Sequence, residues 1–308
     1  MRIELTHGRA VAVMVLVTLL WSIAGVVTRH LDSAQPFEVT FWRSAANAVA
    51  LGGLLVWQRG ARALLKDLRI GGRLFWLCSL CWCVMFTAFM LAMTLTTVAN
   101  VLITMATAPL FTALIARVTL HQKLPLRTWL AIVAAGCGIA WMYGAEVAGG
   151  SPQDLLGVLV AAMVPLAGAT MWTLQQANAR RAEGERIEMT TPVLVGAVAS
   201  ALVTLPPAWP LAASGHDIGL LVMLGVVQLA IPCVLAVAAG RVLKAPEAAL
   251  LGLLEIIFGV AWTWLGGNES PTAAVLGGGG LVLLALAGNE AVALWRASPA
   301  GRAQAGAS

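Results

Sequence analysis

The sequence predicts an all-α membrane protein with ten transmembrane helices in two inverted five-helix repeats and with both termini in the cytoplasm. Three observations lead to this prediction: the composition, the spacing of the apolar runs, and the distribution of Lys and Arg. Of the 308 residues, 60% are hydrophobic and 11% are charged, and the mean hydropathy is +0.87. Soluble proteins carry about 25% charged residues, so this chain has too few to cover a surface that faces water.

The composition also excludes several other classes of protein. A chain this apolar is neither a pair of soluble domains nor disordered, and its net charge of +5 does not indicate a nucleic-acid partner. All five cysteines lie inside predicted spans. Cys78, Cys81 and Cys83 are close in sequence, but no His shares their span, which is not the usual arrangement of zinc ligands. We expect no metal and no cofactor.

The predicted helices come from apolar runs long enough to cross a bilayer, which takes about 20 residues. The first run is too long for the apolar core of a signal peptide and lacks a cleavage site, so we expect it to be retained. The connections are short and leave no room for an inserted soluble domain. The ten runs are 10–31, 37–57, 74–94, 98–116, 126–143, 155–177, 190–210, 217–240, 246–265 and 272–294.

Basic residues fix the predicted orientation, because cytoplasmic loops are enriched in Lys and Arg. Every Lys and Arg except Arg29 and Arg43 lies near a terminus or in an even-numbered connection. The odd-numbered connections carry acids instead. We therefore expect a multi-pass protein of the cell inner membrane, whose basic segment 59–73 contacts anionic lipid headgroups.

Similar features recur in the two halves of the chain. Trp21 and Arg29 in the first span are eight residues apart, as are Trp172 and Arg180 in the sixth, and the segments from Ala99 and Pro246 align at a shift of 147. Since five is an odd number, two five-helix halves must face opposite ways in the membrane. The predicted units are repeats over 1–150 and 151–296, followed by a disordered cytoplasmic tail over 297–308.

Several short motifs connect the chain to a known family. The motif residues are Trp21-Ser22, Pro36 through Trp42-Arg43, Ala99 through Pro109-Leu110-Phe111, Ala245 through Leu254-Glu255, and Gly267-Asn268-Glu269. With them the chain resembles the EamA-like ten-helix branch of the drug/metabolite transporter superfamily. It departs from the family pattern at Leu120-His121-Gln122, where Leu-Gly-Glu is common, and at Glu255-Ile256, where Glu-Pro is usual.

The resemblance implies a secondary transporter rather than an enzyme. Such a protein would export or exchange small amino-acid-like or amphipathic metabolites by alternating access through a central cavity. The sequence contains no recognisable catalytic motif, which agrees with this expectation.

Glu255 is the clearest candidate binding residue, because a charge inside a span is costly and normally faces the protein or a water-filled cavity. Gly252, Gly259 and Trp262 share its helix face and would leave room for a ligand beside an aromatic wall. Glu255 could bind a substrate ammonium or carry a coupling proton. The alternative is a structural carboxylate bonded to a neighbouring helix.

Arg43 is the second intramembrane charge, and Asn47 follows it by one helical turn. Together they could hold a substrate carboxylate. Arg43 could equally extend to the outer interface or bind Asp32 or Glu38.

Further polar and aromatic residues at helical spacing are candidates for the lining of a cavity: Trp21, Ser22, Trp82, Asn100, Thr104, Trp172 and Gln176. The internal prolines Pro109, Pro165 and Pro232 each free a carbonyl and are candidate hinges, with static kinks as the alternative.

Two other functions stay open. An anion or nucleotide-sugar exchanger would need more cationic groups than Arg43 supplies, and a non-transporting membrane scaffold would tolerate loss of Glu255. The expected partners are a small-molecule substrate and the lipid bilayer, with protons as a candidate coupling ion and no nucleic acid. Gly136-Cys137-Gly138 and Gly277–Gly280 are candidate helix contacts within a monomer or a homodimer.

Overall fold

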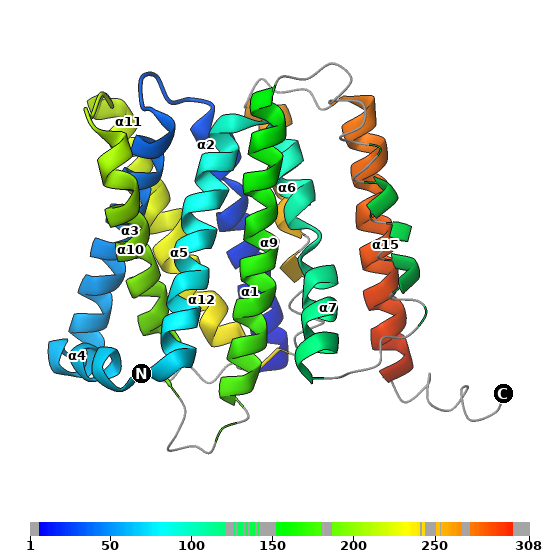
Figure 1. Cartoon of the computed structure of the whole chain (residues 1–308), viewed down its shortest axis with the longest axis horizontal. Helices are drawn as coiled ribbons and strands as arrows, with labels where there is room; N and C mark the ends of the chain where they lie inside the picture. Colours follow the sequence, from blue (N-terminus) through cyan, green and yellow to red (C-terminus); the bar gives the residue numbers. More distant parts are fainter. Residues whose placement is uncertain are drawn as a thin grey trace.

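The computed structural model of the chain is a bundle of long helices that lie side by side (Figure 1). It describes five continuous segments, residues 6–120, 152–179, 187–240, 254–266 and 272–297. It also describes the shorter stretches and single residues 126, 129–131, 133–134, 136–138, 141, 181, 242–243 and 251–252. Within these residues the elements are helices joined by short turns.

The helices of the first half follow the predicted runs closely. A short amphipathic helix, α4, is added between the second and third spans, inside the basic segment 59–73. The helices are α1 (His7–Ser22), α2 (Ala24–Thr28), α3 (Pro36–Arg59), α4 (Ala61–Ile70), α5 (Gly72–Leu95), α6 (Val98–Met105) and α7 (Ala108–Leu120).

The second half agrees equally well where it is described. Eight of the 18 residues of the predicted fifth span, 126–143, lie outside the described residues, as does the predicted tail after Ala297. The helices are α9 (Pro152–Ala179), α10 (Thr190–Ala208), α11 (Gly215–Met223), the π-helix η2 (Leu224–Ala230), α12 (Ile231–Ala239), α14 (Leu254–Gly266) and α15 (Ala273–Ala297).

Six of these helical stretches are long and apolar enough to cross a membrane: His7–Thr28, Pro36–Arg59, Gly72–Leu95, Leu155–Gln175, Thr190–Ala208 and Gly215–Ala239. The protein is thus a multi-pass membrane protein, as the composition predicts. The total of ten spans and the side of the membrane that each end faces stay predictions.

Two of the predicted spans are interrupted rather than continuous. The first turns at Ile23, between α1 and α2, and the fourth breaks at Ala106-Thr107, between α6 and α7. At the second break the Thr107 hydroxyl donates to the Thr104 carbonyl at 2.6 Å, and Pro109 follows in the first turn of α7. Since proline has no N–H, the helix is weakest just before it.

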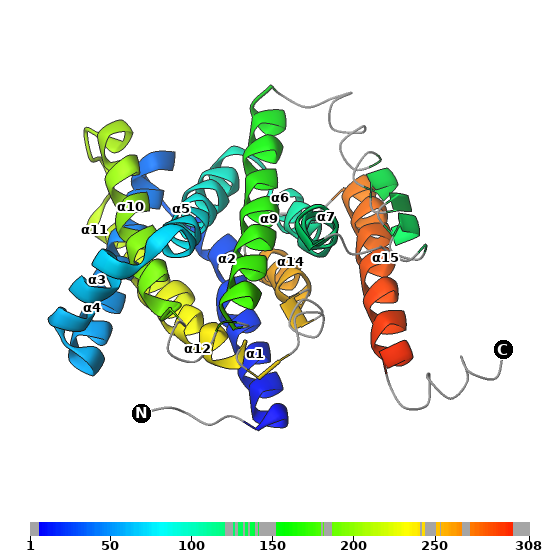
Figure 2. The ribbon, with the colours of Figure 1, turned by 60° about the horizontal axis from the view of Figure 1, so that its bottom comes forward.

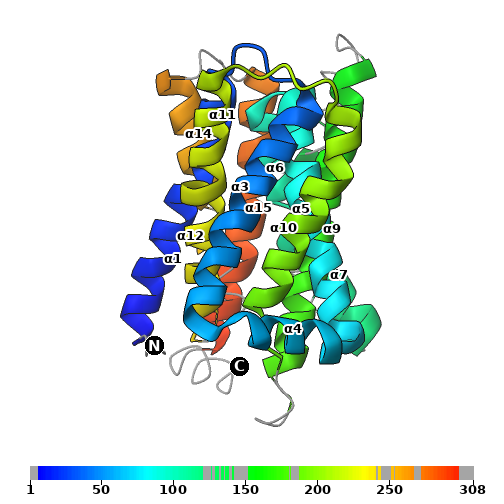
Figure 3. The ribbon, with the colours of Figure 1, turned by 90° about the vertical axis from the view of Figure 1, so that its left-hand side faces the viewer.

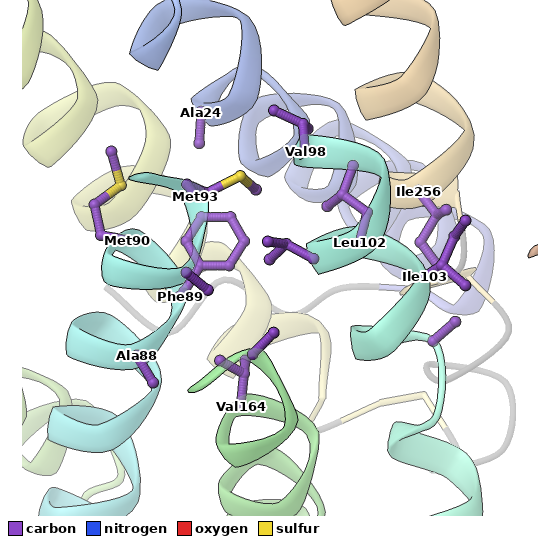
Figure 4. Packing of buried hydrophobic residues seen from close by; sticks show 14 of the residues in the cluster. Ala24, Ala88, Phe89, Met90, Met93, Val98, Leu102, Ile103, Val164 and Ile256 are labelled. Atoms are coloured by element: carbon purple, nitrogen blue, oxygen red, sulfur yellow. The ribbon is translucent and has the colours of Figure 1, made fainter. Parts of the chain in front are cut away.

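The helix α5 packs against α9 and α10, and α3 packs against α10 and η2. Figure 4 shows the largest apolar cluster, in which Phe89 and Met93 of α5 meet Leu102 of α6, Val164 of α9 and Ile256 of α14. The helix α15 lies on the side of the bundle remote from α3 and α4 (Figure 2). Because these contacts join helices far apart in the sequence, the two halves share one core.

The start of α1 and the end of α15 lie at the same end of the bundle (Figure 3). The basic helix α4 lies across that end, beneath α3 and α10. The turns around 29–35 and 209–214 lie at the other end. The start of α1 and the end of α15 thus lie at the end of the bundle that carries the basic helix α4.

Candidate functional site

Arg43 lies in the interior of the bundle, with 1% of its surface exposed. Its two terminal nitrogens donate to Gln228 Oε1 at 3.1 Å and to the Phe86 carbonyl at 3.2 Å. The guanidinium carbon also lies 5.5 Å from the centre of the Phe89 ring, within the range of a cation–π contact. Within the described part of the chain, no carboxylate pairs with this charge.

The location of Arg43 corrects the alternative that it reaches the interface or binds Asp32 or Glu38. Glu38 accepts hydrogen bonds from the backbone N–H groups of Ala212 and Ala213. The Oδ2 atom of Asp32 lies 3.3 Å from Nδ1 of His216. Arg43 is held inward because its polar partners come from α5 and η2, which flank α3 at this depth.

Several buried polar atoms of α3 and α5 have no hydrogen-bond partner among the described residues. They are Arg43 Nε, both side-chain polar atoms of Asn47, and Trp82 Nε1, all buried. A buried polar group left unpaired costs about 1–3 kcal/mol, and native proteins contain few such groups. We refer to Arg43, Asn47, Trp82 and Gln228 as the central polar cluster. It has donors and acceptors available for a ligand.

Gln228 is a site residue that the sequence did not predict. Its Oε1 accepts from Arg43, and its Nε2 donates to the Trp21 carbonyl at 3.2 Å. Gln228 lies in the π-helix η2, which ends just before Pro232. Gly225 brings η2 close to α3, because a Cβ at this position would lie 2.6 Å from the Arg43 carbonyl oxygen. A polar residue four positions before a proline in an apolar run was the available signal.

A chain of polar contacts leads from this cluster to α14. Gln228 bonds to the carbonyl of Trp21, at the end of α1, and the next residue, Ser22, accepts a hydrogen bond from Trp262 Nε1 at 3.1 Å. The Ser22 and Trp262 side chains are therefore in contact, and the Trp21 carbonyl links them to Gln228. The turn at Ile23 lies directly beside them.

Glu255 lies in the first turn of α14 and is half-buried. Its carboxylate has no hydrogen bond or ion pair to any other described residue. Gly259 does not leave room for a ligand, contrary to the expectation, because the space beside it is filled by the Leu102 side chain. Gly252, one turn before Glu255, has open space beside it.

The other predicted lining residues are spread over the bundle. Asn100 and Thr104 are buried in α6, where Asn100 Nδ2 donates to Thr96 Oγ1 at 3.2 Å and the Thr104 hydroxyl donates to the Asn100 carbonyl at 2.7 Å. Trp172 of α9 packs beside the apolar cluster that contains Leu51 and Phe86. The side chain of Gln176 lies outside the described residues.

The candidate hinges differ in their surroundings. Pro109 follows the break between α6 and α7, and Pro232 follows η2, so both lie at irregular backbone. Pro165 lies inside the continuous helix α9. Irregular backbone inside a membrane protein is tolerated where it is buried in protein or lines a cavity.

A second set of buried charges lies at the end of the bundle opposite α4. Asp217 accepts from the backbone N–H groups of Asp32, Ser33 and Ala34 at 2.8–3.0 Å. Glu38 in turn accepts from Ala212 and Ala213 at 3.0 and 2.9 Å. We call Glu38 and Asp217 the carboxylate brace. Each holds the turn that leads into the other's helix.

His216 lies next to the brace. Asp32, His216 and Asp217 each offer one atom that could bind a metal ion, and these three atoms lie within 4.8 Å of one another. Both oxygens of Asp217 already accept hydrogen bonds from the loop, so this group of residues serves to hold the loop.

Comparison with known proteins agrees with this architecture. Residues 8–144 match the model of the EamA-like transporter family, the family that the sequence resemblance names. A protein of known crystal structure, at 18% sequence identity, aligns with a TM-score of 0.63 over 94% of this chain and 97% of its own. That likeness shows a fold in common with this protein over both halves of the chain. None of the curated proteins searched matches the chain.

Proposed function

We propose that the protein is a secondary transporter that exports or exchanges small amino-acid-like or amphipathic metabolites across the inner membrane. The central polar cluster holds the anionic part of the substrate, and Glu255 binds its ammonium group or carries a coupling proton. The transporter family match over residues 8–144 supports the general class.

The buried, unpaired charge of Arg43 carries this proposal. An Arg that serves packing alone is normally paired, because a buried charge without a counter-ion is costly. Among the described residues, Arg43 has neutral partners only, and its Nε and the side-chain amide of Asn47 have no hydrogen-bond partner. A bound carboxylate would satisfy the guanidinium by charge-assisted hydrogen bonds, which are about twice as strong as neutral ones.

We propose that the helices move relative to one another at the points where their backbone is irregular. The turn at Ile23, the break at Ala106-Thr107 and the π-helix η2 interrupt otherwise regular spans. In an inverted repeat, alternating access comes from one group of helices rocking against another around a site near the middle of the membrane. Pro109 and Pro232 adjoin two of these interruptions, whereas Pro165 lies inside the continuous helix α9, so the proposed hinges are Pro109 and Pro232.

The anion or nucleotide-sugar exchanger has less support. Such ligands carry several negative charges, and among the described residues Arg43 is the buried cation. A single guanidinium suits a substrate with one carboxylate better.

The test is uptake into liposomes that contain the purified protein, with a panel of radiolabelled amino acids, sugars and organic cations. We expect uptake of at least one amino-acid-like compound. Arg43→Gln should reduce that uptake at least about ten-fold, since a hydrogen bond to a charged group contributes about 1.5–3 kcal/mol. Glu255→Gln should also reduce it, and Asp32→Asn, an exposed acid at the end of the bundle, serves as the matched control.

Equal uptake by wild type and Glu255→Gln would remove Glu255 from the mechanism. If no compound is taken up, and none raises the unfolding temperature of the purified protein, the scaffold becomes the better interpretation.

A further inference from the structure

The helix α4 carries a stripe of cations along one face. Arg62, Lys66 and Arg69 follow one another at intervals of four and three residues, and all three are exposed. Side chains at this spacing lie above one another on an α-helix. Leu64, on the opposite side of the helix, is buried against the protein.

The acid within α4 does not neutralise this stripe. Asp67 accepts from Arg59 at 2.7 Å and from the Thr191 hydroxyl at 2.7 Å, and so fixes α4 to the ends of α3 and α10. Within the described part of the chain, Arg62, Lys66 and Arg69 have no anionic partner. The helix is therefore held rigidly while its cations are available to a ligand.

Two tryptophans indicate the depth of α4 in the membrane. Trp57, three residues before Gly60, is 83% exposed, and Trp76, in the second turn of α5, is 51% exposed. Exposed Trp residues gather at the level of the lipid headgroups. Since α4 lies between these residues in the chain and across the end of the bundle (Figure 3), it lies at that level.

Exposed apolar side chains border the cationic stripe. Leu65 on one side is 54% exposed, and Ile70 on the other is 68% exposed. A helix with Lys and Arg beside exposed apolar residues is typical of one that lies in the plane of the membrane interface.

We propose that α4 is a binding surface for anionic phospholipids of the surrounding bilayer. Arg62, Lys66 and Arg69 contact the lipid phosphates, and Leu65 and Ile70 contact the upper part of the acyl chains. The contact between Asp67 and Arg59 keeps the three cations aligned. This surface does not depend on the transport function proposed above, and its ligand is part of the membrane.

The test compares the purified protein in nanodiscs of phosphatidylcholine with nanodiscs that contain phosphatidylcholine and phosphatidylglycerol in equal parts. The measurements are the unfolding temperature and the retention of phosphatidylglycerol on the protein by native mass spectrometry. We expect wild type to retain phosphatidylglycerol and to unfold at a higher temperature in its presence. Lys66→Gln should weaken retention about five-fold, since each basic residue near an anionic surface contributes about 1 kcal/mol.

Two variants separate this effect from general charge and from folding. Arg9→Gln removes an exposed cation from the start of α1, at the same end of the bundle, and should leave retention unchanged. Lys66→Arg keeps the charge and should retain the lipid as wild type does.

Equal losses in Lys66→Gln and Arg9→Gln would overturn the proposal, since the effect would then be one of net charge. Loss in Lys66→Arg would also overturn it. Stabilisation by inorganic phosphate equal to that by phosphatidylglycerol would show that the surface binds a soluble anion instead of a lipid.

Discussion

The carboxylate brace and the central polar cluster are both buried, but they differ in how completely their polar atoms are paired. In the brace, every oxygen of Glu38 and Asp217 accepts at least one hydrogen bond. In the cluster, neither the side-chain polar atoms of Asn47 nor the ring N–H of Trp82 have a hydrogen-bond partner within the part of the chain that the structure describes. Both sets are contributed by helices of the two halves, so their position alone does not explain the difference.

The comparison indicates which buried polar residues hold the fold and which are available for function. A fully paired carboxylate that accepts backbone N–H groups stabilises the loops that it contacts. A cluster whose buried polar atoms lack hydrogen-bond partners lowers the stability of the fold. Departures of this kind from complete pairing are typical of functional sites. Substitutions in the brace should thus lower the stability of the protein, and substitutions in the cluster should lower transport.

Asp217→Ala should have the largest effect on stability. It leaves the N–H groups of Asp32, Ser33 and Ala34 without their acceptor, which we expect to cost about 3 kcal/mol. Thermal unfolding of the purified protein measures this. An unfolding temperature equal to that of wild type would show that water or another acceptor replaces the carboxylate.

Glu38→Gln should have a smaller effect, because the amide keeps one oxygen acceptor. The other oxygen becomes an NH2 group that faces a backbone donor, either Ala212 or Ala213, and we expect a loss of about 2 kcal/mol. The same unfolding assay measures it, with Glu38→Asp as a control for the length of the side chain. A loss larger than that of Asp217→Ala would contradict the ranking.

Gln228→Leu should destabilise the protein by about 1 kcal/mol, because a terminal nitrogen of Arg43 loses its acceptor. The volume of the side chain at position 228 stays similar. Its effect on uptake should be larger than its effect on unfolding, since the guanidinium is no longer held in place. Gln228→Glu is the informative companion, because it pairs Arg43 internally and should also block an anionic substrate. Normal uptake in Gln228→Glu would exclude Arg43 as the anion-binding group.

Arg43→Met should have the smallest effect on stability, within about 1 kcal/mol of wild type, because the cost of burying the charge is removed while the Gln228 and Phe86 oxygens lose a donor. Uptake should nevertheless be lost. Unfolding and uptake measured on the same preparation test this pair of outcomes. A large loss of stability would assign Arg43 to the fold and weaken the distinction between the two groups.

The helices were predictable because their signal is local. The apolar runs predict α3, α5, α10 and α15 to within a few residues, since about 20 apolar residues are required to cross a bilayer wherever they occur in the chain. The interruption at Ala106-Thr107 was less visible, although Pro109 indicated it. The π-helix η2 was not predicted, because the apolar pattern does not distinguish it from an α-helix.

The candidate site was predictable in part. Arg43 and Asn47 stand out as polar residues within a span, and they are one turn apart on a single helix. Their partner Gln228 was missed as a site residue, and Gly259 was assigned to an opening that Leu102 fills. Both errors concern contacts between different helices. The spacing of residues along a single helix carries no information about such contacts.

By itself, the sequence determined that the chain is a helical membrane protein, where its helices lie and which segments carry its positive charge. These properties follow from composition and from short-range spacing. The tertiary structure alone decided which buried charges are paired. Asp32 and Asp217, like Arg43 and Gln228, are 185 positions apart and meet only when the two halves pack together. Pairing depends on atomic distances across helices, so the same residue types form a complete brace at one end and an incomplete cluster in the interior.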